Sequence, residues 1–316
     1  MRISDVGRDA DRLWAITCFF NPAGSRRRLA NYRVFRQRLT VPLVAVELAY
    51  GSNFELNEND AEILVQLLGG PDILWQKERL LNLALEVLPS SCCQVAWLDC
   101  DIVFEADDWA ERTSALLDRF MLVQPFSRVH WMPPNWEPGE ARPPEGQSLG
   151  SVPFLIASGV PVANCLGVPT SQITCAPGGV WAADRQLLDQ HSLYDACVIG
   201  GADSVIVRAA FGCFEDATRL LHLNNQGRKH YLAWANPFYA TVRAQVAFVD
   251  GNLLHLWHGK FEHRGYLQRH EELRRFQFNP FKDIAIAHNG AWRWNSDKRE
   301  MHDYVRDYFA SRREDG

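Results

Sequence analysis

The sequence contains no run of apolar residues that approaches the roughly 18 continuous positions of a membrane-spanning helix. Its first six residues, Met1 to Val6, also lack the apolar segment of a secretory signal. We therefore expect a cytoplasmic protein with no integral membrane segment.

Basic charge is not in excess, since the formal net charge is -5 over 316 residues. This mild acidity provides no electrostatic attraction toward nucleic acid or an anionic membrane, so no nucleic-acid-binding surface is expected. The eight cysteines contain no C-x-x-C pair and mostly lie in apolar runs. They are therefore expected to be reduced, buried thiols. No internal repeat is present.

What the chain does have is the length and apolar content of one large α/β domain or two modest ones, with 47% hydrophobic and 22% charged residues. Strand-like and helix-like segments alternate in its first half, which favours a mostly parallel sheet covered by helices. The predicted strands are residues 13–20, 41–48 and 94–98, and the predicted helices are residues 25–39, 73–88 and a helix from Asp107 or Asp108 to about Phe120.

The second half is less regular. Residues 126–152 are rich in proline and glycine and are expected to form a loop, a lid or a disordered segment. Further helices are predicted from Asp184, from Gly200-Gly201-Ala202-Asp203 to Phe211, over residues 230–246 with an interruption near Pro237, and over residues 301–312.

Asp99-Cys100-Asp101 follows the apolar run 94–98, which reads as a buried strand. Two carboxylates at i and i+2 where a strand emerges can share one hard cation. The competing interpretation is a polar strand end in a turn, where aspartate is common. Asn21 and Glu47 also lie at predicted strand ends, and ligands of open α/β sheets bind at that edge, so all four could meet in one crevice.

A second group of polar residues lies late in the chain, in Asn252-Leu-Leu-His255-Leu-Trp257-His258-Gly-Lys260, followed by Arg264. A strand here would put His255 and Trp257 on one face and His258 on the other, with His258 leaving the strand toward a ligand. Neutral imidazoles suit a metal ion, and Lys260 or Arg264 suits phosphate oxygens. Each histidine alone could equally be a satisfied core residue.

Asp203 is either a helix N-cap or an acid that meets a substrate, with Gly200 and Gly201 allowing close approach to the backbone.

Taken in order, these motifs resemble the GT-A-fold, metal-dependent glycosyltransferases. The resemblance covers about residues 13 to 270 and rests on Asp99-Cys100-Asp101, Gly200-Gly201-Ala202-Asp203, and His258 or His255. Lys77 and Asn82 resemble the polar residues that such enzymes carry on the helix before the Asp-x-Asp strand. A single aspartate stands where several inverting branches have a Glu-Asp pair.

The resemblance implies one GT-A-like domain over residues 1–316. A nucleotide-sugar-binding half would cover about residues 10–125, and an acceptor-binding half with C-terminal helices would cover residues 153–316. The donor would be a UDP- or GDP-sugar, and the acceptor a glycan, lipid, small molecule, protein or nucleobase.

The resemblance also implies roles for individual residues. Asp99, Asp101, His258 and His255 would be the ligands of Mn²⁺ or Mg²⁺. Asn21, Glu47, Lys77, Asn82, Lys260 and Arg264 would hold the donor together with Asp99. Asp203 would be the base in an inverting mechanism, and the resemblance leaves inversion or retention open.

Three other classes are compatible with parts of the pattern. Leu98-Asp99-Cys100-Asp101-Ile102-Val103 also fits a haloacid-dehalogenase-like phosphatase, with the first aspartate as nucleophile. Gly24-Ser25-Arg26-Arg27-Arg28 resembles the phosphate loop of a sugar nucleotidyltransferase. A non-enzymatic binding module would use the same acids and histidines as caps and core hydrogen-bonding groups.

Overall fold

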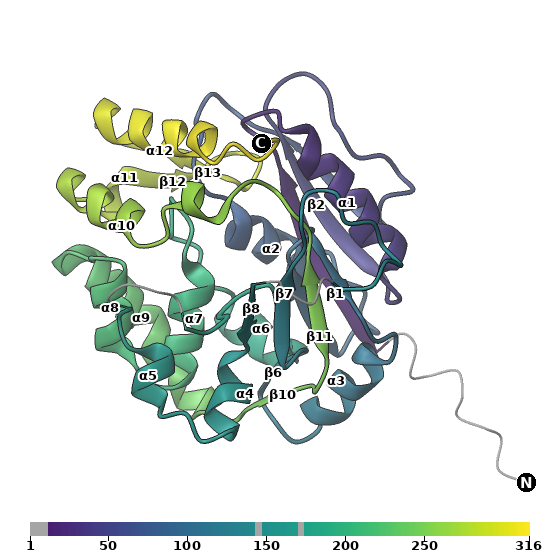
Figure 1. Ribbon diagram of the computed structural model, residues 1–316. Coiled ribbons are helices and arrows are strands. Elements are labelled where there is room, and N and C mark those ends of the chain that lie inside the picture. The colour runs from purple at the N-terminus through teal and green to yellow at the C-terminus, as the bar shows by residue number, and fades with distance from the viewer. Residues whose placement is uncertain (1–11, 143–146, 170–173) are drawn as a thin grey trace, which may run out of the picture.

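A seven-stranded sheet forms the centre of the computed structural model, which describes residues 12–142, 147–169 and 174–316 (Figure 1). Its strands are β1 (Leu13–Phe20), β2 (Leu43–Ala49), β3 (Ile63–Leu68), β4 (Gln94–Leu98), β6 (Leu122–Gln124), β9 (Val180–Asp184) and β10 (Val246–Phe248). They are ordered β10-β6-β9-β4-β1-β2-β3, and all pairs are parallel except those that β9 makes with β4 and β6. The predicted α/β class with a mostly parallel sheet is confirmed.

The sheet is buried on both faces because its strands are almost wholly apolar. Ile16 and Cys18 of β1 belong to one apolar cluster, whereas Ala15 and Phe19 belong to another, as the alternation of a strand requires. The first cluster contains helices α2 (Lys77–Glu86), α7 (Ala202–Ala210), α9 (Asn225–Val242) and α12 (Arg299–Ser311). The second contains α1 (Arg26–Arg38) and α3 (Trp109–Leu117).

A second sheet of four short strands lies beside the carboxyl end of β4. Its strands are β5 (Ile102–Phe104), β11 (Asn252–His255), β7 (Arg128–Trp131) and β8 (Ser148–Gly150), in the order β5-β11-β7-β8. Because β11 runs antiparallel to β5, His255 pairs with Ile102, and the Leu256 amide donates to the Asp101 carbonyl at 2.8 Å. This pairing joins the late histidines to the aspartates that follow β4.

The remaining elements complete the second half of the chain (Figure 1). They are α4 (Val152–Ala157), α5 (Val162–Leu166), α6 (Arg185–His191), α8 (Phe214–Leu220), α10 (Gln268–Leu273), α11 (Pro280–Asp283), the 3₁₀ turns Phe261–Arg264 and Arg274–Phe276, and the hairpin β12 (Ile284–Ile286) and β13 (Trp292–Trp294). In the described part of the chain, none of the helices has both the length and the apolar content that spanning a bilayer would require.

Several predicted elements match the structure closely. β1 and β4 have the predicted limits, and α7 begins after Gly201 and ends before Phe211. The helix predicted over residues 73–88 is shorter, since α2 begins only at Lys77. The preceding Trp75 amide instead donates to the Val198 carbonyl at 2.9 Å, which ties this segment to the chain before α7.

Other predictions were wrong. Residues 126–152 do not form one loop, because β7 and β8 lie within that range; residues 143–146 of it lie outside the described part of the chain. Strand β3 was not predicted, since its side chains are mostly half-buried and lack a strong pattern. Asp108 precedes α3 as expected but makes no side-chain cap. The long helix α9 ends at Val242 and contains Pro237 without breaking.

Candidate active site

A cavity of about 250 Å³ opens at the carboxyl ends of β1 and β4, the edge at which open α/β sheets bind ligands. Four stretches of chain supply most of its charged lining: the residues after β4, the start of α2, the start of α7 and the chain after β11. The ionisable side chains of the lining include Lys77, Asp99, Asp101, Asp203, His255, His258, Arg264, Arg269 and Arg312. The structure therefore brings most of the predicted site residues together.

Asp101, His255 and His258 form a cluster whose potential ligand atoms all lie within 4.8 Å of one another. Oδ2 of Asp101 is 3.0 Å from Nε2 of His258, and Oδ1 is 3.8 Å from Nε2 of His255. Oδ1 is buried and has no hydrogen-bond partner in the described residues. Because an unpaired buried oxygen is costly, this atom points to a missing cation or donor.

The hydrogen bonds of the two imidazoles indicate which nitrogen carries the proton. Nδ1 of His255 donates to the Leu256 carbonyl at 2.9 Å, and Nδ1 of His258 faces Oε1 of Glu314 at 3.5 Å. In this arrangement both Nε2 atoms keep their lone pairs and face the Asp101 carboxylate. The Nε2 lone pair of His258 also accepts from Nη2 of Arg264 at 2.8 Å, and a metal ion bound to both imidazoles would replace that contact.

The ionisation states of Asp101 and His255 are also those that bind a metal ion. Burial raises the pKa of Asp101, but the two imidazoles outweigh it and hold this pKa well below its usual range. Burial lowers the pKa of His255 to about 3, against the opposing effect of Asp101. At neutral pH the carboxylate is therefore ionised and the His255 imidazole neutral, which are the forms that bind a metal ion.

Asp99 does not join this cluster, contrary to the expectation that it shares the metal with Asp101. Nζ of Lys77 lies 2.6 Å from Oδ1 of Asp99 and 2.8 Å from Oδ2 of Asp203. Strand β4 ends at Leu98, so the alternation that would align residues i and i+2 does not continue through the two aspartates. Asp101 consequently faces the histidines, whereas Asp99 faces the first residue of α2.

Lys77 thus links Asp99, which follows β4, to Asp203 at the start of α7. Burial by itself lowers the pKa of Lys77, but Asp203 and Asp99 raise it well above the usual value. Burial raises the pKa of Asp99 to about 6, although the Lys77 ammonium acts in the opposite direction. The ammonium therefore stays charged and fixes the position of both carboxylates.

Asp203 is not a helix N-cap. Gly201 is the cap residue of α7, and the Asp203 carboxylate instead pairs with Lys77 and lines the cavity. Gly200 and Gly201 have φ values of 82° and 98°, in the left-handed region that favours glycine. The backbone also comes close to the carboxylate elsewhere, because a Cβ on Gly178 would lie 2.7 Å from Oδ2 of Asp203.

The prediction that His255 and His258 lie on opposite faces of a strand was wrong. β11 ends at His255 and the chain then turns, so the two imidazole rings stack with centroids 5.1 Å apart and both reach Asp101. Trp257 points instead toward α1, where the Arg27 guanidinium lies 5.2 Å from the centre of its ring.

The two predicted phosphate-binding cations behave differently. Arg264 is buried, lines the cavity and places Nη2 2.8 Å from Nε2 of His258. The Lys260 side chain is 70% exposed, lies nearest to Glu262 and does not line the cavity. The lysine follows Gly259, whose φ of 88° turns the chain away from the site.

Asn21, Glu47 and Asn82 are not brought to the cavity. Nδ2 of Asn21 donates to the Ser25 carbonyl and to Glu55, and Glu47 accepts from the Glu55 amide at 2.6 Å. Asn82 exchanges hydrogen bonds with the Leu193 backbone. These side chains hold loops in place, a role that sequence position alone does not distinguish from ligand binding.

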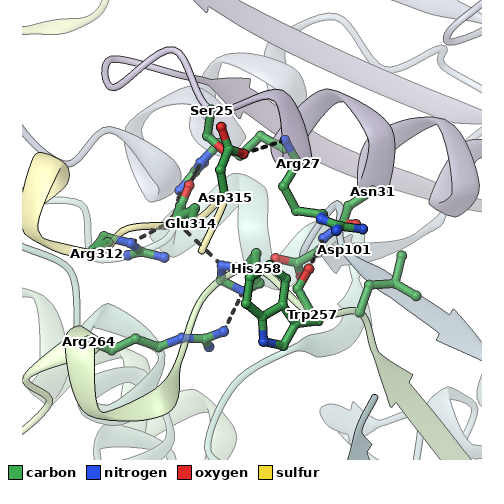
Figure 2. A network of polar contacts seen from close by, with 12 residues as sticks. Ser25, Arg27, Asn31, Asp101, Trp257, His258, Arg264, Arg312, Glu314 and Asp315 are labelled. Atoms are coloured by element: carbon green, nitrogen blue, oxygen red, sulfur yellow. Dashed lines mark hydrogen bonds and ion pairs between the residues drawn. The ribbon is translucent and has the colours of Figure 1, made fainter. Parts of the chain in front are cut away.

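Three residues near the C-terminus also lie against the cluster and were not predicted as site residues: Arg312, Glu314 and Asp315 (Figure 2). The buried Glu314 carboxylate accepts from Arg28 at 2.6 Å and from Arg312 at 2.7 Å, and these arginines hold its pKa well below the usual range although burial raises it. Asp315 accepts from Oγ of Ser25 at 2.6 Å. No local pattern indicates these contacts, although Arg28 belongs to the basic run noted after the first strand.

No protein-family model matches the chain, and no curated protein matches its sequence. Among solved structures it is similar to the mannosyltransferase PcManGT from Pyrobaculum calidifontis, in complex with GDP-Man and Mn²⁺. The identity is 13% and the TM-score 0.42, and the match covers 84% of this chain and 62% of that one.

It is also similar to glucosyl-3-phosphoglycerate synthase from Mycobacterium tuberculosis, with 13% identity, a TM-score of 0.35, and coverage of 78% of this chain and 71% of that one. A third similar structure is 4-diphosphocytidyl-2C-methyl-D-erythritol synthase from Anaerococcus prevotii, with 11% identity, a TM-score of 0.34, and coverage of 78% and 90%.

Proposed function

We propose that this protein is a metal-dependent glycosyltransferase that moves a sugar from a nucleoside-diphosphate sugar to a hydroxyl-bearing acceptor. The observation that carries the proposal is one cavity lined by a carboxylate with two imidazoles and by a separate carboxylate held by Lys77. The first group suits a divalent cation, and the second suits a proton acceptor. Sugar transfer from a diphosphate donor needs a neutralised leaving group, and transfer with inversion also needs a base.

Asp101, His255 and His258 would hold the ion. Oδ2 of Asp101 and Nε2 of His258 lie 3.0 Å apart, close enough for both to bind one ion. The unpartnered Oδ1 of Asp101 fits the same role. Two imidazole nitrogens favour Mn²⁺ over Mg²⁺, which takes oxygen ligands. When bound, the ion supplies Lewis-acid neutralisation of a departing diphosphate.

Arg264 would bind the diphosphate beside the ion. Its Nε is buried without a partner in the described residues, so the guanidinium has a hydrogen bond left to donate. Arginine donates charge-assisted hydrogen bonds to phosphate oxygens, and these strengthen as negative charge develops on the leaving group.

Asp203 would take the proton from the acceptor hydroxyl. Lys77 holds Oδ2 at 2.8 Å, while Oδ1 makes no hydrogen bond to the described residues. A carboxylate fixed through one oxygen presents the other in a defined direction, which is what a general base requires. Lys77 and Asp99 would serve this site by positioning Asp203 and the donor.

The proposal is tested by incubating the protein with a panel of UDP- and GDP-sugars, with Mn²⁺ or with EDTA, and measuring release of the nucleoside diphosphate. We expect at least one donor to release its nucleoside diphosphate in the presence of Mn²⁺ but not in the presence of EDTA. Parallel incubations contain a nucleoside triphosphate or a phosphomonoester in place of the nucleotide sugar. The proposal fails if no nucleotide sugar is consumed, if the triphosphate yields pyrophosphate instead, or if the phosphomonoester yields inorganic phosphate.

A further inference from the structure

Cationic side chains outnumber acids around the cavity. Its lining contains Arg28, Lys77, Arg208, Arg264, Arg269 and Arg312, but only three acidic side chains, Asp99, Asp101 and Asp203, among the described residues. Lys77 is paired with two of these acids, and Arg28 and Arg312 share Glu314 behind the cavity wall. Three arginines are left without an ion pair in the described part of the chain. Buried charges are costly without a partner, so this surplus needs an explanation.

Two of these three arginines, Arg208 and Arg264, already have an assigned role. Arg208 donates to the carbonyls of Leu166, Ser204 and Gly167, and so holds the chain around α5 in place. Arg264 lies at the metal cluster, where the proposed function assigns it to the diphosphate. Arg269 is then the cation whose partner is missing.

Arg269 is 7% exposed and held rigidly. Its Nη1 donates to the Tyr308 hydroxyl at 2.5 Å and its Nε to Nε2 of His270 at 3.2 Å. The guanidinium lies 5.1 Å from the centre of the Tyr266 ring and 5.5 Å from that of Tyr308. Nη2 makes no hydrogen bond to the described residues. A guanidinium fixed in this way is prepared to bind an anion with little loss of side-chain entropy.

The free edge of Arg269 lies beside the glycines that precede the proposed base, and both side chains line the same cavity. A Cβ on Gly200 would be 3.5 Å from Nη2 of Arg269, and a Cβ on Gly201 would be 2.8 Å from Nε2 of His270. Both glycines lead directly into α7, a helix of nine residues whose first turn contains Asp203. The amide end of a helix favours negative charge, so it adds to the attraction of the guanidinium.

We infer that the acceptor carries an anionic group, a carboxylate or a phosphate, which binds Nη2 of Arg269 and thereby places a hydroxyl of the same molecule at Asp203. This inference rests on the proposed function and deepens it by naming the chemical class of the acceptor. The metal and Arg264 receive the donor diphosphate, whereas Arg269 receives the second anion. A neutral acceptor would leave the buried Arg269 charge unpaired.

The test uses three sugars that differ only in the group at C6: glucose, which is neutral, and glucuronate and glucose 6-phosphate, which are anions. Thermal stabilisation by each is measured for the wild type, Arg269→Gln and Arg269→Lys, with and without Mn²⁺ and UDP. Arg275→Gln is the matched control, since this arginine is 68% exposed and does not line the cavity. Arg269→Lys keeps the charge and serves if the glutamine variant does not fold.

At least one of the two anions is expected to stabilise the wild type more than glucose does. Arg269→Gln should weaken that binding by about tenfold or more, because a hydrogen bond to a charged group contributes that much. Arg269→Lys should weaken it less, and Arg275→Gln should leave it unchanged. Comparison of glucuronate with glucose 6-phosphate separates a carboxylate from a phosphate. Equal stabilisation by all three sugars, or an anion preference that survives in both Arg269 variants, would overturn the inference.

The proposed function is judged separately. Stabilisation by Mn²⁺ with UDP, or with GDP in a parallel series, does not involve Arg269. If the wild type shows no such stabilisation, that result counts against the donor site alone. An Arg269-dependent anion preference without any response to Mn²⁺ and nucleotide would retain the anion site and reject the glycosyltransferase.

Discussion

Oε1 of Glu314 lies 3.5 Å from Nδ1 of His258, on the side of the ring opposite Asp101 (Figure 2). A carboxylate at Nδ1 keeps the proton there and leaves the Nε2 lone pair to accept, as the outer partners of metal-bound histidines do. In the structure Nη2 of Arg264 lies 2.8 Å from this Nε2, a contact that a bound metal ion would replace. The same carboxylate holds Arg28 and Arg312, so one acidic residue far along the chain connects the cluster to two cavity cations.

Asp101→Asn should reduce Mn²⁺ affinity by more than about 100-fold, beyond the loss that follows removal of an outer-shell partner. The substitution keeps the shape of the side chain but removes the charge that both imidazoles face. Titration of Mn²⁺ followed by electron paramagnetic resonance measures it, and Asp108→Asn, at an exposed acid before α3, is the control. Unchanged Mn²⁺ binding in Asp101→Asn would place the metal elsewhere.

Glu314→Gln should weaken Mn²⁺ binding by about tenfold, because an amide oxygen is a poorer acceptor for Nδ1 of His258 than a carboxylate. The same titration measures the effect, with the exposed Glu300→Gln on α12 as its control. Stability should fall as well, since the variant leaves Arg28 and Arg312 without their counter-charge. A variant that is less stable but binds Mn²⁺ as tightly as the wild type would give Glu314 a purely structural role.

Asp203→Asn should abolish sugar transfer while leaving binding of the nucleotide and Mn²⁺ within about twofold, because general-base catalysis contributes about 10² to 10⁴ in rate and needs the carboxylate. The measurement compares product formation with nucleotide affinity by calorimetry. If nucleotide affinity falls instead, Asp203 belongs to the donor site.

The stability of the metal-free protein should depend on His270 below pH 6.5. Burial and the neighbouring Arg269 hold the pKa of His270 well below its usual value. As the pH falls through 6.5, the unfolded chain therefore binds a proton that the folded chain does not, and stability is lost. This stabilisation is fully present above pH 6.5.

Between pH 7.5 and 5.5 the wild type should lose about 1.4 kcal/mol more unfolding free energy than His270→Gln. Urea unfolding in EDTA at the two pH values measures the difference. Parallel losses in the two proteins would show that His270 binds a proton in the folded state.

The amino-acid sequence determined strands β1, β2 and β4 of the central sheet and the place of the site. β1 and β4 are continuous apolar runs that can be stable only when buried on both faces, so their limits follow from composition. Carboxylates directly after β4 lie at the ligand-binding edge of such a sheet for the same reason. Asp101, His258 and Asp203 were predicted from motifs at element ends and Lys77 from the family resemblance, and all four line the cavity.

Only the tertiary structure decided which of these side chains contact one another. The chain leaves strand geometry after Leu98, so Asp99 pairs with Lys77 while Asp101 meets two histidines about 155 positions later. Glu314 and Arg269 reach the site through packing of distant segments, and Asn21, Glu47 and Asn82 are drawn into loop contacts. Periodicity reports which face a residue occupies within one element. It contains no information on which elements meet, because that depends on the packing of the whole chain.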